Sequence, residues 1–155
     1  MAQARFKRGY EKLKKEYRFP HNNLFVIALL TLIAFLLVEL VIRIYNLYKT
    51  VPVVDVPSHL SAGIALSIIF FWALSLTKSR RKRAMSIVFT FIAACIWEIL
   101  ETLEQMVIEN PPWMIDYFFW DGFWDIIVTV AGGLIGLWIL GMLKNKTSLL
   151  NNLEF

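Results

Sequence analysis

The sequence has a single cysteine, Cys95, and lacks the short motifs of several enzyme classes. One cysteine excludes an internal disulfide and a Cys-x-x-Cys pair. There is no Gly-rich phosphate loop, no Gly-x-Ser-x-Gly nucleophile elbow and no His-Glu-x-x-His. Nucleotide-driven transport and zinc-protease chemistry therefore have no support in the residues.

Long apolar runs are what the chain has in excess. Of its 155 residues, 58% are hydrophobic, well above the usage of ordinary soluble domains. The four runs cover about 24–48, 58–77, 86–108 and 122–143. Each approaches or exceeds the roughly 20 residues that a helix needs to cross the hydrocarbon of a bilayer. The sequence thus predicts an all-α membrane protein with four transmembrane helices in one domain, residues 22–144.

Basic residues alternate along the chain and predict the orientation. Lys and Arg are abundant in 1–21 and 78–83 and follow the fourth run, but the connections 48–57 and 109–121 hold one Lys and no Arg. Basic segments stay in the cytoplasm. We therefore expect a multi-pass protein of the cell membrane, with both termini and the tail 145–155 cytoplasmic.

The first segment, 1–21, mixes basic and aromatic side chains. Its simplest interpretation is a cytoplasmic, positively charged tail that sets the topology. The alternative is a short amphipathic helix lying on anionic lipid. No stacking or groove-reading motif accompanies the charge, so nucleic acid is not expected as a partner.

Carboxylates interrupt the third apolar run. Glu98, Glu101, Glu104 and Gln105 fall within an arc of roughly 120° on a helix and form one stripe. Counted from residue 108, Glu98 would lie about 15 Å below the outer end, near the bilayer midplane. An unpaired charge there is costly, so the stripe should face protein, water or a cation.

Two other spans carry polar pairs at the same predicted side of the membrane. Asp55 and His59 begin the second span, and Asp121 and Asp125 begin the fourth. Each pair has the four-residue spacing that puts both side chains on one helical face. Three helices are therefore expected to direct one histidine and several carboxylates toward a site that faces outward.

Histidine combined with carboxylates is a ligand set for a divalent cation: Mg, Mn, Ca or Zn. We expect His59, Glu98, Asp121 and Asp125 to hold the ion, with Glu98 and Glu101 catalytic and Glu101 the general base. Without a metal, such a cluster could share protons instead. The expected supporting residues are Asp55, Glu104, Gln105, Asp116, Glu39 and Arg43.

Several of these residues also have structural interpretations. Asp121 could cap a helix, Asp116 could be solvated at the interface, and Glu39 with Arg43 could form a local ion pair. Gly132 and Gly136 form a Gly-x-x-x-Gly seam for close helix approach, either within one chain or at the face of a homo-oligomer.

The polar motifs resemble those of the small polytopic membrane proteins of the VanZ-like and YjdF-like (DUF2238-type) group. The resemblance covers roughly residues 55–136. Its motifs are Asp55-x-x-x-His59, Trp97-Glu98-x-x-Glu101, Trp120-Asp121-x-x-x-Asp125 and Gly132-Gly133. The order is closer to the YjdF-like pattern than to the VanZ pattern, in which Gln follows the Glu. The resemblance implies a shared polar site and assigns no reaction.

The residues leave three functional hypotheses open. The preferred one is a metal-dependent hydrolase or transferase acting on a lipid-linked or extracytoplasmic phosphate, although only Arg43 and Lys49 could bind phosphate on that side. The second is a cation or proton carrier or channel that uses Glu98 and Glu101. The third is a non-enzymatic accessory subunit. The lipid bilayer is a partner in all three, so the sequence alone does not decide whether the protein is an enzyme.

Overall fold

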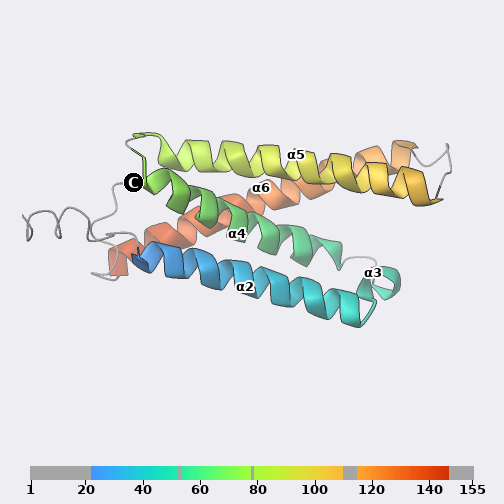
Figure 1. The fold of residues 1–155 in the computed structure, drawn as a ribbon, viewed down its shortest axis with the longest axis horizontal. Coiled ribbons are helices and arrows are strands. Elements are labelled where there is room, and N and C mark those ends of the chain that lie inside the picture. The colour runs from blue at the N-terminus through green and yellow to red at the C-terminus, as the bar shows by residue number, and fades with distance from the viewer. Residues whose placement is uncertain (1–21, 52–53, 78, 110–114, 147–155) are drawn as a thin grey trace, which may run out of the picture.

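The computed structural model describes residues 22–51, 54–77, 79–109 and 115–146 (Figure 1). Within these ranges it contains helices and no strands. The helices are α2 (Asn22–Ile44), α3 (Leu47–Thr50), α4 (Asp55–Ser75), α5 (Lys82–Glu109) and α6 (Ile115–Lys146). The all-α prediction is confirmed. The amphipathic helix expected in 1–21 lies outside the described residues, as do residues 147–155 of the predicted tail 145–155, whose first two residues belong to α6.

The four long helices each contain a segment long and apolar enough to cross a membrane. The segments are Asn23–Ile44, Asp55–Ser75, Lys82–Glu104 and Trp120–Leu143. The first span ends four residues earlier than predicted, because Asn46 takes a left-handed backbone conformation, φ 52°, before α3 begins. Asparagine tolerates this conformation better than most residues. The second span starts at Asp55, with Pro57 in its first turn, where no backbone donor is needed.

Successive long helices run in opposite directions (Figure 1). At one end, here named the carboxylate end, α2 and α5 finish and α4 and α6 begin. At the other, the basic end, α4 finishes and α5 begins after Arg80 and Arg81. Helix α4 is central, since it packs on α2, α5 and α6 and most extensively on α6. Residues at the start of α4 are therefore within reach of three other helices.

Glycines allow α4 and α6 to touch backbone to backbone. A Cβ added to Gly132 would lie 2.2 Å from the carbonyl oxygen of Leu60, and one added to Gly63 would lie 1.9 Å from that of Thr129. Gly136 faces Ile64 and Ser67 in the same way. The seam predicted at Gly132 and Gly136 thus packs inside the chain, against α4. Such close approach lets van der Waals contacts hold helices together in lipid.

The basic half of the molecule has an apolar core. Its buried members come from three helices: Leu24, Ala28, Ile68, Phe71, Leu137 and Leu140. Beside it, Ser86 Oγ donates a hydrogen bond to the carbonyl oxygen of Ser67, 2.6 Å away, which ties α5 to α4. Three ionisable side chains that are only 10–12% exposed, those of His59, Glu98 and Asp125, lie toward the other end.

We predict that Gly132→Ala lowers the free energy of unfolding by about 1–3 kcal/mol, because the added methyl group collides with backbone and not with a mobile side chain. Gly141→Ala is the matched control on the same helix, since its Cβ would meet only the end of the Arg83 side chain, at 3.3 Å. That variant should be neutral or more stable, because alanine favours helix over glycine. Thermal unfolding of both in detergent checks this, and equal behaviour of the two variants would contradict it.

Candidate functional site

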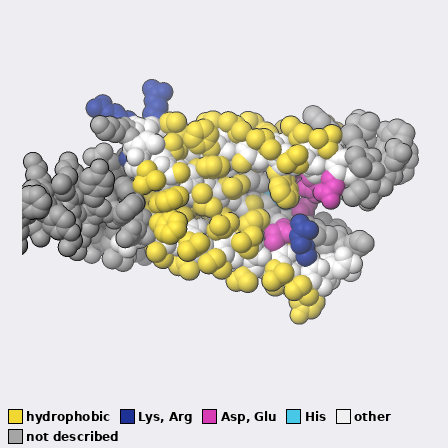
Figure 2. Space-filling model, viewed as in Figure 1, with side chains coloured by type: hydrophobic (Ala, Val, Ile, Leu, Met, Phe, Trp, Pro, Cys, Tyr) yellow, Lys and Arg dark blue, Asp and Glu magenta, His cyan; other side chains and the backbone are white. Residues whose placement is uncertain are grey.

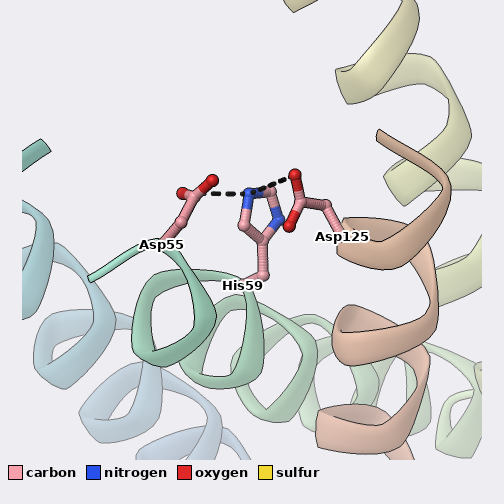
Figure 3. A group of neighbouring side chains, drawn as sticks. All are labelled: Asp55, His59 and Asp125. Carbon is pink, nitrogen blue, oxygen red and sulfur yellow. Dashed lines mark ion pairs between the residues drawn. The ribbon is translucent and has the colours of Figure 1, made fainter. Parts of the chain in front are cut away.

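His59 lies at the centre of a cluster of acidic side chains near the carboxylate end. It is one turn into α4, directly after Asp55 on the same helical face. Its Nε2 atom lies 3.3 Å from Asp55 Oδ1 and 3.7 Å from Asp125 Oδ2. Figure 3 shows the ring edge between these two carboxylates, one from α4 and one from α6. One nitrogen of the imidazole thus faces two aspartates.

The other nitrogen of the same ring faces different groups. His59 Nδ1 lies 3.7 Å from Glu98 Oε1, on α5, and 3.3 Å from Thr129 Oγ1, on α6. Thr129 is buried and follows Asp125 by one helical turn. The two ring nitrogens are chemically distinct, and what one binds fixes the tautomer available to the other. The site is therefore divided into an Nε2 side and an Nδ1 side.

The side chains of the cluster differ in how far they are exposed to solvent. The His59 side chain is 10% exposed and those of Glu98 and Asp125 are 12% exposed, whereas that of Asp55 is 36% exposed. Asp55 therefore marks the opening of the site. Figure 2 shows Asp and Glu side chains in a notch at this end of the molecule, where they are visible from the side of the bundle.

Glu101 extends the cluster on α5. Trp97 Nε1 donates a hydrogen bond to Glu101 Oε2 at 3.0 Å. Gly122 on α6 leaves room for the neighbouring carboxylate, since a Cβ there would lie 3.0 Å from Glu98 Oε2. Donor atoms of His59, Glu98 and Glu101 lie within 4.8 Å of one another, and the same holds for Asp55, His59 and Asp125. The chain thus offers two overlapping ligand sets that share one imidazole.

A second polar chain links α2 to the same turn of α4. Ser58 Oγ donates to Glu39 Oε1 at 2.5 Å, and Arg43 Nε donates to Glu39 Oε2 at 3.0 Å. Ser58 is buried beside His59, whereas the Arg43 side chain is 67% exposed. The ion pair predicted for Glu39 and Arg43 is present, and through Ser58 it adjoins the acidic cluster.

The contact with His59 sets the level of Glu98 along the bundle. Because Glu98 contacts His59, it lies at the level of the first turn of α4, about 6 Å from the start of that helix at Asp55. Helix α5 is 28 residues long and α4 is 21, and α5 extends beyond α4 at this end. The cluster therefore lies near the start of the apolar segments of α4 and α6, and the depth of Glu98 in the bilayer stays a prediction.

Comparison with known proteins assigns the chain to a family. The profile of a family described as "Predicted membrane protein (DUF2238)" matches residues 11–146. The chain belongs to this family. No curated protein and no solved structure matches it. The DUF2238-type part of the resemblance is thereby confirmed, whereas the relation to VanZ-like proteins stays a prediction.

In this DUF2238 protein the predicted site residues separate into groups. His59, Glu98, Glu101 and Asp125 come together, joined by Asp55, which was predicted only as a supporting residue. Asp121 and Glu104 are exposed and belong to neither ligand set, and the side chains of Gln105 and Asp116 lie outside the described ones.

Sequence reasoning missed three polar partners of the site. Thr129 contacts His59, Ser58 contacts Glu39 and Trp97 contacts Glu101. A signal existed for two of them, since Thr129 follows Asp125 and Glu101 follows Trp97 by four residues, which places each pair on one helical face. Nothing in the spacing pointed to Ser58 and Glu39, because their contact crosses from α4 to α2.

Negative charge outweighs positive charge in the cluster. Within the described part of the chain, His59 is the one basic group within ion-pair distance of Asp55, Glu98 or Asp125, and Arg43 is paired with Glu39. One imidazolium cannot neutralise three or four carboxylates, and unpaired charge is costly in a poorly hydrated region. The arrangement is suited to taking up a cation or protons.

We predict that Asp125→Asn raises the stability of the protein in a chelator such as EDTA by about 1 kcal/mol, because it removes one of several like charges and keeps the side-chain shape. If the cluster takes up a divalent cation, millimolar Mn²⁺ should reverse the order, because only the wild type would gain binding energy. Asp121→Asn, at an exposed position, is the control and should change little in either medium. Thermal unfolding measures this, and destabilisation of Asp125→Asn in EDTA would contradict it.

Proposed function

We propose that this membrane protein binds one divalent cation through His59 Nε2 and the carboxylates of Asp55 and Asp125. The observation that supports this most directly is the position of that single nitrogen between two carboxylates from different helices (Figure 3). Divalent ions bind ligands at about 2.0–2.5 Å, so two ligands of one ion lie about 3–5 Å apart. The three donor atoms fall within 4.8 Å of one another.

The donor set narrows the choice of ion. One imidazole nitrogen with carboxylate oxygens suits Mn²⁺ and Zn²⁺, and Mg²⁺ or Ca²⁺ would rely more on the oxygens. The described residues bring no cysteine to the site, since Cys95 is in neither ligand set. Mn²⁺ is therefore the first ion to test.

Glu98 has a different part in this proposal from the one predicted. With Nε2 engaged, Nδ1 keeps its proton and can donate to Glu98 Oε1 or Thr129 Oγ1. A carboxylate behind the far nitrogen fixes the orientation of a ligand imidazole and makes it a better donor. Glu98 and Thr129 would thus position His59, and Glu98 would also offset the charge of the ion.

A cation at this site would supply Lewis-acid chemistry of the kind used in hydrolysis and transfer of phosphate groups. Glu101 is placed to take a proton, because Trp97 orients one of its oxygens and its carboxylate lies in one ligand set with His59 and Glu98. The proposed activity is hydrolysis or transfer at a phosphate. Because basic residues follow α4 at the other end, the positive-inside rule favours an extracytoplasmic position for the site.

A carrier or channel has less support. Beyond His59 the backbones of α4 and α6 meet at Gly63 and Gly132, and the apolar core follows. The buried polar side chains described in that direction bear hydroxyl groups: Ser67, Ser75, Ser86, Thr90 and Thr129. A continuous charged path through one chain would need carboxylates there.

We predict that detergent-purified wild-type protein offered Mn²⁺ or Zn²⁺ retains about one ion per chain after desalting, measured by mass spectrometry of the metal. His59→Ala, Asp55→Asn and Asp125→Asn should retain almost none. Glu98→Gln should weaken binding by about 10–100-fold without abolishing it, as expected of a residue that acts through a ligand.

Two exposed carboxylates give matched controls for that experiment. Asp121→Asn and Glu104→Gln remove charges one turn or more from the cluster and should keep the metal. Loss of metal in Glu98→Gln and Glu101→Gln with retention in Asp55→Asn and Asp125→Asn would move the ion to the Nδ1 side. Absence of metal from the wild type would refute the proposal.

We predict the orientation in a Cys95→Ser background. Thr50→Cys, near the carboxylate end, should react with a membrane-impermeant maleimide on intact cells or spheroplasts. Thr77→Cys, near the basic end, should react only after permeabilisation, because the two exposed positions lie at opposite ends of the bundle. The opposite pattern of labelling would place the site in the cytoplasm.

A further inference from the structure

Exposed tryptophans surround the site at its own level along the helices. Trp97, Trp120 and Trp124 are each more than half exposed, and each directly precedes an acidic residue of the predicted site. Tryptophan collects where lipid headgroups meet acyl chains. Trp138 is also exposed and lies about 21 Å from Trp124 along α6, as a residue of the opposite interface would. The cluster therefore lies at the depth of lipid headgroups.

The notch above the site opens sideways as well as toward the end of the bundle. Helices α2 and α5 both pack on α4 but have at most marginal contact with each other in the described residues. They diverge toward the carboxylate end (Figure 1), and the acidic side chains are visible between them from the side of the bundle (Figure 2). A molecule held in the membrane could enter there without leaving the lipid.

Arg43 lies at this opening and has N–H donors besides the one that binds Glu39. Its Nε atom is held by Glu39, which is held in turn by Ser58, one helical turn after Asp55. The Arg43 side chain is two-thirds exposed, and its ion pair with Glu39 is made through Nε and not through the two terminal nitrogens. A guanidinium fixed on one edge presents its remaining N–H groups in a fork that matches phosphate geometry.

We propose that the site takes the phosphate headgroup of a membrane lipid, which enters between α2 and α5 and is held between Arg43 and the cation. This inference rests on the proposed cation site, because the surrounding carboxylates would otherwise repel a phosphate. In this proposal Arg43 binds the phosphate, and Glu39 and Ser58 position Arg43. The acyl chains of the bound lipid stay in the bilayer beside the bundle.

The test uses full-length protein in detergent, loaded with Mn²⁺ and freed of excess metal. Bound Mn²⁺ accelerates ³¹P relaxation of any phosphate that reaches it, so titration gives a dissociation constant. The two probes are dihexanoyl phosphatidic acid and glycerol 3-phosphate, which share the phosphate monoester and differ in acyl chains. Metal content is measured on the same samples.

We expect phosphatidic acid to bind the wild type at least tenfold more tightly than glycerol 3-phosphate. Arg43→Gln should weaken lipid binding tenfold or more at unchanged Mn²⁺ content, and Arg43→Lys should restore part of it. Arg80→Gln removes another exposed positive charge, at the basic end, and should bind as the wild type does.

Three results would overturn the inference. Equal lipid binding by Arg43→Gln and the wild type would remove the assigned role of Arg43. Equal affinity for both probes would make the ligand a free phosphate and not a lipid. A wild type that takes up no metal would refute the cation site first, and the metal measurement would separate that failure from the other two.

Discussion

Contact between the backbones of α4 and α6 determines where the polar groups of this protein meet. Gly63 lies one turn after His59, and it packs against Thr129, one turn after Asp125. The same close approach brings Asp125 to 3.7 Å and the Thr129 hydroxyl to 3.3 Å from the imidazole. A larger residue at Gly63 or Gly132 would push the helices apart and separate the two sides of the site before it affected the distant apolar core.

The cluster lowers the stability of the folded protein, because its carboxylates repel one another, and other parts of the fold must offset this cost. Carboxylates from α4, α5 and α6 converge on one histidine, and the side chains of His59, Glu98 and Asp125 are at most 12% exposed, so the protein shields them from water. The Gly seam, the Ser86–Ser67 hydrogen bond and the apolar core, all farther from the carboxylate end, hold the helices in place against this repulsion. Such a division between a strained polar end and a well-packed apolar end is typical of a binding site and not of a packing motif.

Much of the architecture could be predicted from the residues. Hydropathy predicted four spans, and four-residue spacing placed Asp55 with His59 and Glu39 with Arg43 on shared faces. The spacing could not predict the contacts between helices. The two ligand sets include Asp55 and not Asp121 because of how α4 and α6 are placed against each other, and the contact between Ser58 and Glu39 crosses from α4 to α2. Periodicity fixes a face of one helix but not which neighbour that face meets.

The central claim is that one cation sits on the Nε2 side of His59, and anomalous diffraction from crystals grown with Mn²⁺ tests it most directly. We predict one strong anomalous peak within about 2.0–2.5 Å of His59 Nε2 and of a carboxylate oxygen from both Asp55 and Asp125. Glu98 should remain within hydrogen-bonding distance of Nδ1. A peak between His59 Nδ1, Glu98 and Glu101, or no peak in a crystal soaked with millimolar Mn²⁺, would contradict the account.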